Sequence, residues 1–551
     1  MKYINTNKIR KSMTKIKILE KTKDPSVNIA LDTINIGKQA IIFVNTKRSA
    51  EAVSEKIAKY STGNKDTEEL SKKISAVLSN PTKQCLRLAN IVSKGMAFHH
   101  SGLLSEQRKL IEDNFRSGVI KIIVATPTLA IGVDLPAFRV IIRDLKRYGL
   151  WGMDYIPVLE YEQQSGRAGR PSYDTFGEAI ILAETVKQKE EITEKYIKGE
   201  PEEIISKLAS EPILRTYILS LIASEFVKDK KGLQGFFSKT FYAKQYGDSK
   251  KLNAIIDKII LQLREWKFLK DDNTEEDDEK NINKQSDFVS ALKISFNGKL
   301  EATLLGKRVS ELYLDPYTAN HLIESIKVTL NIINDKVDDK KYSELTMLHI
   351  ICSCLELRPL LRVKTAEYDE IEEFRNTNEE YLINEVEPFD DDYDEFLAAL
   401  KTSRFFIEWL DEKDEEYLLE KYDVRPGEIY GKLERIDWLL YSASELSRLL
   451  KMISINKELN KLRYRIKYGV KEELIPLLQL KNIGRVRART MFRNGIKDIS
   501  DVKKVDFSTL SRLIGKNVAL DVKKQVGQEF SEEKVKVKEN KRKGQINLND
   551  Y

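Results

Sequence analysis

The chain has 551 residues, of which 41% are hydrophobic and 32% charged, enough apolar material for several packed domains under a solvated surface. Its apolar runs are too short to span a membrane, and no apolar signal core follows the basic N-terminus, so we expect a soluble intracellular protein. Three cysteines (Cys85, Cys352 and Cys354) exclude a disulfide framework and a four-ligand zinc site, and with four histidines we expect no metal centre.

The net charge of +7 is distributed unevenly along the chain. From Asn456 to Tyr551 there are 24 Lys or Arg residues and 12 Asp or Glu residues. In contrast, Thr365–Glu395 carries 14 acidic residues against Arg375 alone. A polybasic end on an otherwise acidic chain is typical of a protein that binds a phosphate backbone. A merely solvated surface would account for the charge equally well.

The first third of the chain predicts an α/β fold with a parallel sheet. Short, nearly continuous apolar runs alternate with stretches of helical spacing, which is typical of parallel strands covered by helices on both faces. The predicted strands are Lys38–Asn45, Ile120–Thr126, Arg139–Leu145 and Gly177–Glu184. In such sheets the ligand site forms on the loops at the carboxyl ends of the strands, and we expect the motifs described below to lie there.

The rest of the chain is predicted to be mostly helical. Short helices over 200–270, an acidic loop at Asp271–Lys284 with almost no apolar residues and short strands after it would suit a winged helix. Long helices are predicted over 309–455, and short helices joined by glycine turns over 470–527. The last residues are poor in apolar side chains and are expected to be disordered.

The strongest chemical signal is the segment Gln163–Pro171, QQSGRAGRP. Arg167 and Arg170 present planar guanidinium groups three residues apart at a predicted helix start, which suits a polyphosphate and the charge of its transition state. A surface turn with incidental arginines is the alternative. Upstream, Ala125–Ala137 follows a strand directly and supplies Thr126 at the strand end, Gly132 for close backbone approach and Asp134 as a hydrogen-bond acceptor. Arg48 and His100 lie at other strand or loop ends, whereas His99 is expected to be structural.

These residues, in this order and spacing, resemble motifs IV, V and VI in the second RecA-like lobe of superfamily 2 helicases. Residues 143–171 also resemble the strand-separating β-hairpin of archaeal Ski-two-like DNA helicases, relatives of the polymerase-theta helicase. Residues 195–224 and 300–319 resemble the winged-helix segment of that family, and residues 474–502 resemble its helix-hairpin-helix domain. The resemblance implies the following order: a lead-in (1–23), a second RecA-like lobe (24–190), a winged helix (191–308), a helical ratchet domain (309–469), a helix-hairpin-helix domain (470–530) and a disordered basic tail (531–551).

The resemblance also implies roles for individual residues. Arg167 and Arg170 would contact the γ-phosphate of ATP, Asp134 would support these arginines, and Gln163 would position nucleotide or water. Nucleotide binding would further involve Gly132, Asp134, Gly166 and Gly169. DNA would be contacted by Thr126, Arg48 and His100. Trp438 occupies the place where the family stacks a base, although a core tryptophan is the alternative. An arginine of the family is replaced by Gly431 or Lys432.

The C-terminal segment Leu480–Arg489 fits a helix-hairpin-helix. Gly484 would expose backbone N–H groups at a helix start, flanked by Arg485, Arg487 and Arg489, and such a site reads the DNA backbone rather than the base sequence. Leu513–Ala519 is a weaker second copy.

The sequence contains no Walker A motif, because no Gly-Lys pair is followed by Ser or Thr. The ligands of Mg²⁺ and of the β- and γ-phosphates are therefore expected on a first lobe that a separate chain supplies. On this interpretation the chain is part of an ATP-dependent 3′–5′ DNA helicase that acts on single-stranded and branched DNA, in the repair or restart of stalled forks. It would work in the cytoplasm of an archaeal-type cell, associated with the nucleoid. A non-catalytic DNA-binding or regulatory protein is the alternative, and an RNA helicase fragment is a weaker one.

Overall fold

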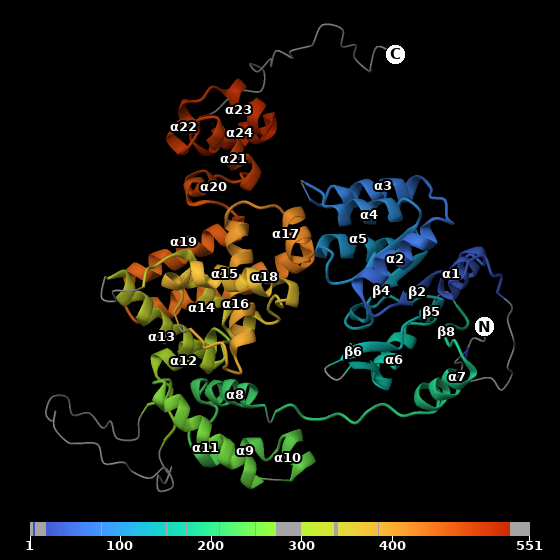
Figure 1. Cartoon of the computed structure of the whole chain (residues 1–551), viewed down its shortest axis with the longest axis horizontal. Coiled ribbons are helices and arrows are strands. Elements are labelled where there is room, and N and C mark those ends of the chain that lie inside the picture. Colours follow the sequence, from blue (N-terminus) through green and yellow to red (C-terminus); the bar gives the residue numbers. More distant parts are fainter. Residues whose placement is uncertain are drawn as a thin grey trace. The chain divides into compact units, whose positions relative to one another are not determined.

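The computed structural model describes residues 4–5, 18–78, 80–149, 152–170, 174–208, 210–247, 249–270, 299–334, 340–383 and 385–528. These residues form two compact units (Figure 1). The first unit draws on Met1–Ile205 and Glu415–Gly431, and the second on Ser206–Asp414 and Lys432–Tyr551. The predicted acidic loop at Asp271–Lys284, the strands expected after it and the predicted tail over 531–551 lie outside the described residues.

A six-stranded sheet organises the first unit, in the order β1-β8-β5-β2-β4-β3. All neighbours pair in parallel except β1, which runs antiparallel to β8. Every residue of the five parallel strands is buried, which explains their near-continuous apolar sequences. The strands are β1 (Ile4–Asn5), β2 (Ala40–Phe43), β3 (Met96–His99), β4 (Ile122–Ala125), β5 (Arg139–Ile142) and β8 (Glu178–Ile181).

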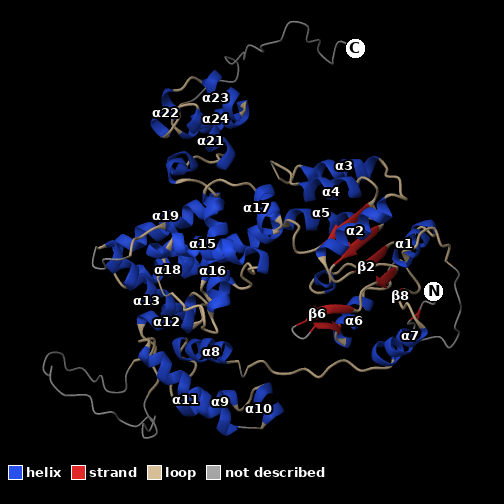
Figure 2. Ribbon diagram, in the orientation of Figure 1, coloured by secondary structure: helices blue, strands red, loops and turns tan. Residues whose placement is uncertain are grey.

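Helices surround this sheet (Figure 2). Several begin where the sequence offers a side-chain cap: Asp24, Thr46 and Thr82 each accept a hydrogen bond from a backbone N–H of the helix that follows. The helices are α1 (Pro25–Asn35), α2 (Lys47–Ala58), α3 (Lys65–Ser75), α4 (Lys83–Val92), α5 (Ser105–Arg116), the 3₁₀ turn η1 (Pro127–Ala130), α6 (Val158–Ser165), α7 (Val186–Ile192), the π-helical turn η2 (Thr193–Ile197) and α17 (Glu415–Tyr422).

The four predicted strands are confirmed as β2, β4, β5 and β8, and the parallel α/β fold is confirmed with them. Strand β3 was not predicted. Between the β5 strand and helix α6, strands β6 (Lys146–Gly149) and β7 (Gly152–Tyr155) form an antiparallel hairpin, as the resemblance implied. The tip of that hairpin lies outside the described residues.

Helices make up most of the second unit. Its N-terminal part contains α8 (Glu211–Ala223), α9 (Lys230–Phe237), α10 (Phe241–Tyr246) and α11 (Ser249–Glu265). Two isolated antiparallel bridges, Asp229 with Lys299 and Leu269 with Ala302, flank the segment that is not described. These helices and bridges suit a winged helix, which stays a prediction because residues 271–298 lie outside the described residues.

Long helices follow, with a separate small core at the C-terminal end of the chain. The helices are α12 (Leu304–Glu311), α13 (Pro316–Ile333), α14 (Glu344–Cys352), α15 (Tyr368–Thr377), α16 (Tyr393–Leu410), α18 (Pro426–Leu449), α19 (Ile453–Tyr468), α20 (Ile475–Leu478), α21 (Arg485–Arg493), α22 (Ile499–Lys504), α23 (Phe507–Ile514) and α24 (Lys516–Gln525), with the 3₁₀ turns η3 (Leu355–Leu357), η4 (Thr365–Glu367), η5 (Glu379–Tyr381) and η6 (Glu472–Leu474). The small core contains only residues from Val470 onward, close to the predicted boundary at residue 470.

The predicted helical domain over 309–469 differs from the observed units in one respect. Residues Glu415–Gly431, which hold α17 and the start of α18, belong to the first unit. Helix α18 therefore contributes residues to both units. None of the described helices is long and apolar enough to cross a bilayer.

Candidate nucleotide and DNA sites

The loop between β4 and β5 separates the predicted site residues into two groups. Because β4 and β5 are parallel, this loop starts at the carboxyl edge of the sheet and must return to the amino edge. Thr126 lies at its start and Ala137 at its end. The N–H of Ala137 donates to Arg167 O at 2.9 Å, and Ala137 O accepts from Gly169 N at 2.6 Å, so this end of the loop is bound to Gln163–Pro171, the segment that resembles motif VI. The expectation that every motif lies at the carboxyl ends of the strands is therefore wrong for Arg167 and Arg170.

Arg167 is held by the backbone of the same loop. Its Nε and Nη2 donate to the carbonyl oxygen of Ala130 at 3.2 and 2.6 Å. Asp134, which was expected to support the arginine, has a side chain that is 95% exposed and lies 3.8 Å from Nη1. An exposed ion pair of that length contributes little, so the Ala130 carbonyl is the group that orients Arg167.

Arg170 is fixed by two side chains that the sequence did not point to. Its Nε donates to Asp174 Oδ2 at 2.8 Å and its Nη1 to Gln39 Oε1 at 2.6 Å. The Asp174 side chain is only 1% exposed and also accepts from Lys38 Nζ at 2.6 Å. These hydrogen bonds, that with Arg170 first, lower the pKa of Asp174 below its usual value. The spacing of four residues between Arg170 and Asp174 is the one signal in the sequence that could have found this pair.

Gln39 is buried immediately before strand β2. Its Nε2 donates to the carbonyl oxygens of Phe115 and Ile120, both at 2.7 Å. Because both amide protons are used, the Oε1 atom is turned toward Arg170. The side-chain amide thus connects the loop between α5 and β4 to the second motif VI arginine.

Of the three predicted nucleotide-binding glycines, two have a backbone conformation that favours glycine and one does not. Gly132 and Gly169 have φ of +80° and +97°, where a side chain would be strained. Gly166 has an ordinary φ of −64° and ends helix α6 with a hydrogen bond to Glu162. Gln163 is exposed on α6.

At the carboxyl edge, Thr126 is largely buried and Arg48 lies in the first turn of α2, and their contacts with DNA stay predictions, whereas His100 is not at the surface. Thr126 follows β4, and its Oγ1 lies 3.0 Å from that of Thr128. Arg48, in α2, is exposed and donates to Asp423 Oδ2 at 2.8 Å. His100 is fully buried and stacks on Phe98 with ring centroids 5.3 Å apart. A side chain without exposed surface does not contact DNA, which corrects the role predicted for His100.

His100 instead belongs to a buried cluster with Glu51 and Arg425. Glu51 Oε1 lies 3.3 Å from His100 Nε2 and 3.2 Å from Arg425 Nε. Burial opposes ionisation of Glu51, but its contacts with His100 and Arg425 outweigh that effect and lower its pKa to about 2. Burial also lowers the pKa of His100. This cluster, which the sequence did not reveal, ties the start of α18 to the α/β fold of the first unit.

Trp438 lies in the part of α18 that belongs to the second unit. It is partly buried, and its indole N–H donates to the carbonyl oxygen of Leu312 at 3.1 Å. Lys432 is buried, with Nζ donating to Pro359 O at 2.7 Å, so this residue does not replace an exposed arginine. A Cβ on Gly431 would have no atom within 4 Å. The base-stacking role of Trp438 stays a prediction.

The three arginines of the predicted helix-hairpin-helix have different surroundings. Arg485 lies 4.5 Å from the ring centroid of Trp409. Arg489 pairs with Glu412 and Glu473, and these contacts raise its pKa. Only Arg487 is fully exposed. This corrects the prediction for Arg489, whose guanidinium is held by two carboxylates and stabilises α21 against the preceding helices.

Gly484 is the N-cap of α21 and carries no side chain to cap the helix. A Cβ there would have no atom within 4 Å, so the first N–H groups of α21 are approachable.

Two protein-family models match parts of the chain. Residues 22–172 match the helicase conserved C-terminal domain, and residues 345–469 match domain 4 of archaeal helicases. The chain is 38% identical over 540 residues to the ATP-dependent DNA helicase Hel308 of Methanococcus vannielii, covering 94% of this chain and 70% of the relative. Hel308 proteins of Pyrococcus abyssi and Pyrococcus horikoshii are 37% and 36% identical, each over 94% of this chain and 67% of the relative.

The chain belongs to the Hel308 family. The predicted resemblance to archaeal superfamily 2 DNA helicases is thereby confirmed. The chain spans about two thirds of the length of these Hel308 relatives. Among the described residues, no cluster of His, Cys, Asp and Glu side chains suits a metal ion.

Proposed function

We propose that this chain supplies the second RecA-like lobe, the DNA-tracking helices and the C-terminal DNA-binding domain of an ATP-dependent 3′–5′ DNA helicase. The observation that carries the proposal is the pair Arg167 and Arg170, each oriented by groups of its own lobe. A protein that only binds DNA has no physical need for two oriented arginines away from the strand ends where Thr126 and Arg48 lie. This argues against the non-catalytic alternative.

The arginine pair fits a nucleotide that approaches from another lobe. Guanidinium groups stabilise charge on a transferring phosphoryl group, and an arginine delivered from outside the phosphate-binding loop is worth 10³ to 10⁵ in rate. Bound ATP with Mg²⁺ would supply the phosphoryl group and neutralise its charge, and this chain would orient Arg167 and Arg170 toward it. The 551 residues contain no Walker A loop to hold the phosphates, and we propose that a first RecA-like lobe provides it.

The DNA substrate is proposed from the remaining features. Thr126 and Arg48 lie at the carboxyl edge of the sheet, and the β6–β7 hairpin would separate strands. The open N-terminus of α21 and Arg487 would contact the backbone without reading its sequence. We propose that such a helicase acts on single-stranded and branched DNA at stalled forks.

The test is reconstitution with a first-lobe chain. We expect the two chains to co-purify and to hydrolyse ATP in a DNA-dependent manner, whereas this chain alone does not. Arg170→Ala should lower turnover at least 10³-fold and change DNA affinity by no more than about threefold. Arg362→Ala, at an exposed arginine of the second unit, is the matched control and should leave both unchanged. Wild-type turnover by the Arg170→Ala complex would contradict the proposal.

A further inference from the structure

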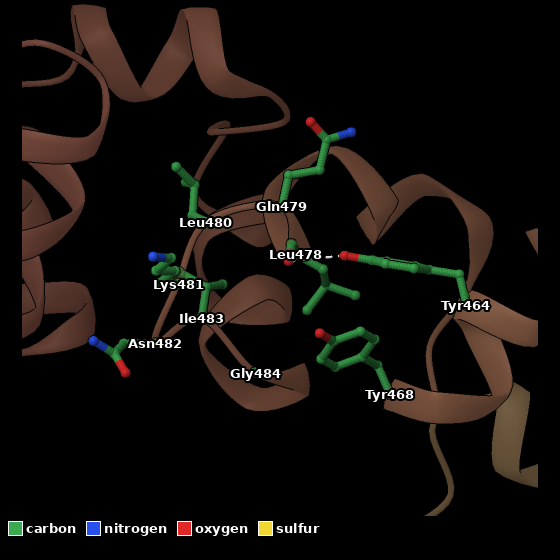
Figure 3. Close-up of a pocket in the computed structure, with 9 residues that line it drawn as sticks. All are labelled: Tyr464, Tyr468, Leu478, Gln479, Leu480, Lys481, Asn482, Ile483 and Gly484. Atoms are coloured by element: carbon green, nitrogen blue, oxygen red, sulfur yellow. Dashed lines mark hydrogen bonds between the residues drawn. The ribbon is translucent and has the colours of Figure 1, made fainter.

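A pocket of about 430 Å³ lies between the end of α19 and the hairpin that leads into α21 (Figure 3). Its volume is within the range of small-molecule sites. Both walls belong to the second unit. The lining residues are Tyr464, Tyr468, Leu478, Gln479, Leu480, Lys481, Asn482, Ile483 and Gly484.

One wall of the pocket is aromatic. Tyr464 and Tyr468 are four residues apart on α19 and therefore share a face of the helix, with ring centroids 5.0 Å apart. The hydroxyl of Tyr464 donates to the carbonyl oxygen of Leu478 at 2.9 Å, which fixes the ring against the opposite wall (Figure 3). Both rings are partly buried and pack against the small C-terminal core, and the ring surface that lines the pocket is of the kind on which nucleobases stack, whatever the base.

The other wall mixes the apolar side chains of Leu478, Leu480 and Ile483 with polar residues, and it continues into the N-terminus of α21. The backbone N–H of Lys481 donates to Gln525 Oε1 at 2.7 Å, and the side chain of Asn482 donates to Asp521 Oδ2 at 2.7 Å. Lys481 and Arg487 are exposed, and Lys467 Nζ lies 5.4 Å from the ring centroid of Tyr468. The pocket thus combines an aromatic wall with cations at its rim, which suits a base and its neighbouring phosphates.

Packing on Trp409 holds the two walls at a fixed distance. Trp409 Nε1 donates to Ile466 O at 2.8 Å, and a Cβ on Gly469, which follows Tyr468, would lie 2.5 Å from Trp409 Cε2. Arg485, the first residue of α21, lies over the same indole ring. Because both walls are anchored to one side chain, the pocket exists before a ligand binds and little ordering cost is expected on binding.

We propose that this pocket binds one nucleobase of single-stranded DNA, stacked on the tyrosine wall, with the adjoining phosphates at Lys481 and the start of α21. The assignment rests on the proposed function and adds a base-binding subsite to a domain expected to contact backbone only. Duplex DNA would bind there less well, because its bases are paired and unstacking them costs a few kcal/mol.

The experiment uses this full chain and a fluorescent single-stranded oligonucleotide. Stacking of one base is worth about 1–3 kcal/mol, so Tyr468→Ala should weaken single-strand binding about 5- to 150-fold. Tyr468→Phe keeps the ring and should bind within twofold of wild type. Tyr60→Ala, at an exposed tyrosine of the first unit, is the control for nonspecific loss. Thermal melting of each variant checks that it is folded.

A scan of single abasic sites through the oligonucleotide gives a second readout that needs no variant. We expect one position to weaken binding of the wild-type chain and to have no effect on Tyr468→Ala. Equal affinity at every abasic position, or an unchanged affinity of folded Tyr468→Ala, would overturn the pocket assignment while the chain still binds DNA. If the wild-type chain binds no DNA at all, the proposed function fails, and the assignment fails with it.

Discussion

At the scale of single residues, the position of a motif VI arginine depends on a buried amide. Gln39 uses all of its strong hydrogen-bonding groups, two donors to Phe115 and Ile120 and one acceptor for Arg170. In Gln39→Ala the Phe115 carbonyl keeps the N–H of Gly118 and Arg170 keeps Asp174, whereas the Ile120 carbonyl loses its hydrogen bond from Gln39. Since one unsatisfied buried group costs about 1–3 kcal/mol, we expect the first unit to lose about that much unfolding free energy in urea titrations. Turnover of the reconstituted enzyme should fall as well, because Arg170 loses its second anchor.

Gln84 offers a matched control for this prediction. It is as buried as Gln39, in the same unit, but neither of its amide atoms has a hydrogen-bond partner in the described part of the chain. Gln84→Ala should therefore cost far less stability and leave turnover unchanged. Equal losses for the two variants would mean that volume, and not hydrogen bonding, makes Gln39 important.

The sequence predicted residue types better than residue surroundings. QQSGRAGRP indicated the two arginines that we propose for phosphate contact, since paired guanidinium groups suit a polyphosphate. Nothing in the sequence indicated that Gln39, 131 positions from Arg170, would be its partner. His100 and Arg489 were predicted to contact DNA because of the motifs in which they lie. In the folded chain His100 is buried beside Glu51 and Arg489 pairs with Glu412, and such contacts between distant residues cannot be read from the sequence.

At the scale of elements, the first turn of α18 is packed against the loop after β3. Gly427 N–H donates to Gly102 O at 3.0 Å, and a Cβ on Gly427 would lie 2.2 Å from the backbone oxygen of Leu103. Gly427→Ala must therefore displace the helix start, at an expected cost of about 1–3 kcal/mol. Gly431→Ala, one turn later where a Cβ meets no atom within 4 Å, should instead stabilise by up to about 1 kcal/mol. Chemical denaturation would check both, and a stabilising Gly427→Ala would show that the contact is absent.

Element prediction failed where a run was short or where tertiary packing chose the partner. Strand β3 has only four residues, Met96–His99. Gly95 precedes it and the polar His100 follows it in the chain, so the sequence of this region resembles a loop. It is buried because it pairs with β4, which the sequence could not show. Likewise, nothing in the long helical pattern over 309–455 indicated that Glu415–Gly431 joins the first unit.

At the scale of the whole molecule, the positive charge is concentrated in the C-terminal core and not in the residues after it. Residues 470–528 carry 13 Lys or Arg and six Asp or Glu, whereas residues 529–551 carry six and five. Lysines and arginines that neutralise phosphates release counterions, so log affinity falls with log salt by about 0.7 per contact for single strands. The residues that set the salt dependence of DNA binding should therefore precede residue 529.

Two truncations separate these contributions. Ending the chain at residue 528 removes a net charge of only +1 and should leave the affinity for single-stranded DNA and its salt slope nearly unchanged. Ending it at residue 469 removes a further net +7 together with a core whose buried residues all lie after residue 469, and it exposes the surfaces of Tyr464 and Tyr468 that pack against that core. We expect this shorter chain to bind more weakly to all DNA sequences alike, with a salt slope shallower by several units. Fluorescence anisotropy between 50 and about 200 mM salt would measure both quantities over the range where such contacts are lost. If the chain that ends at residue 469 had the wild-type salt slope, the DNA anchor would lie in the preceding helices and the role proposed for α21 would be wrong.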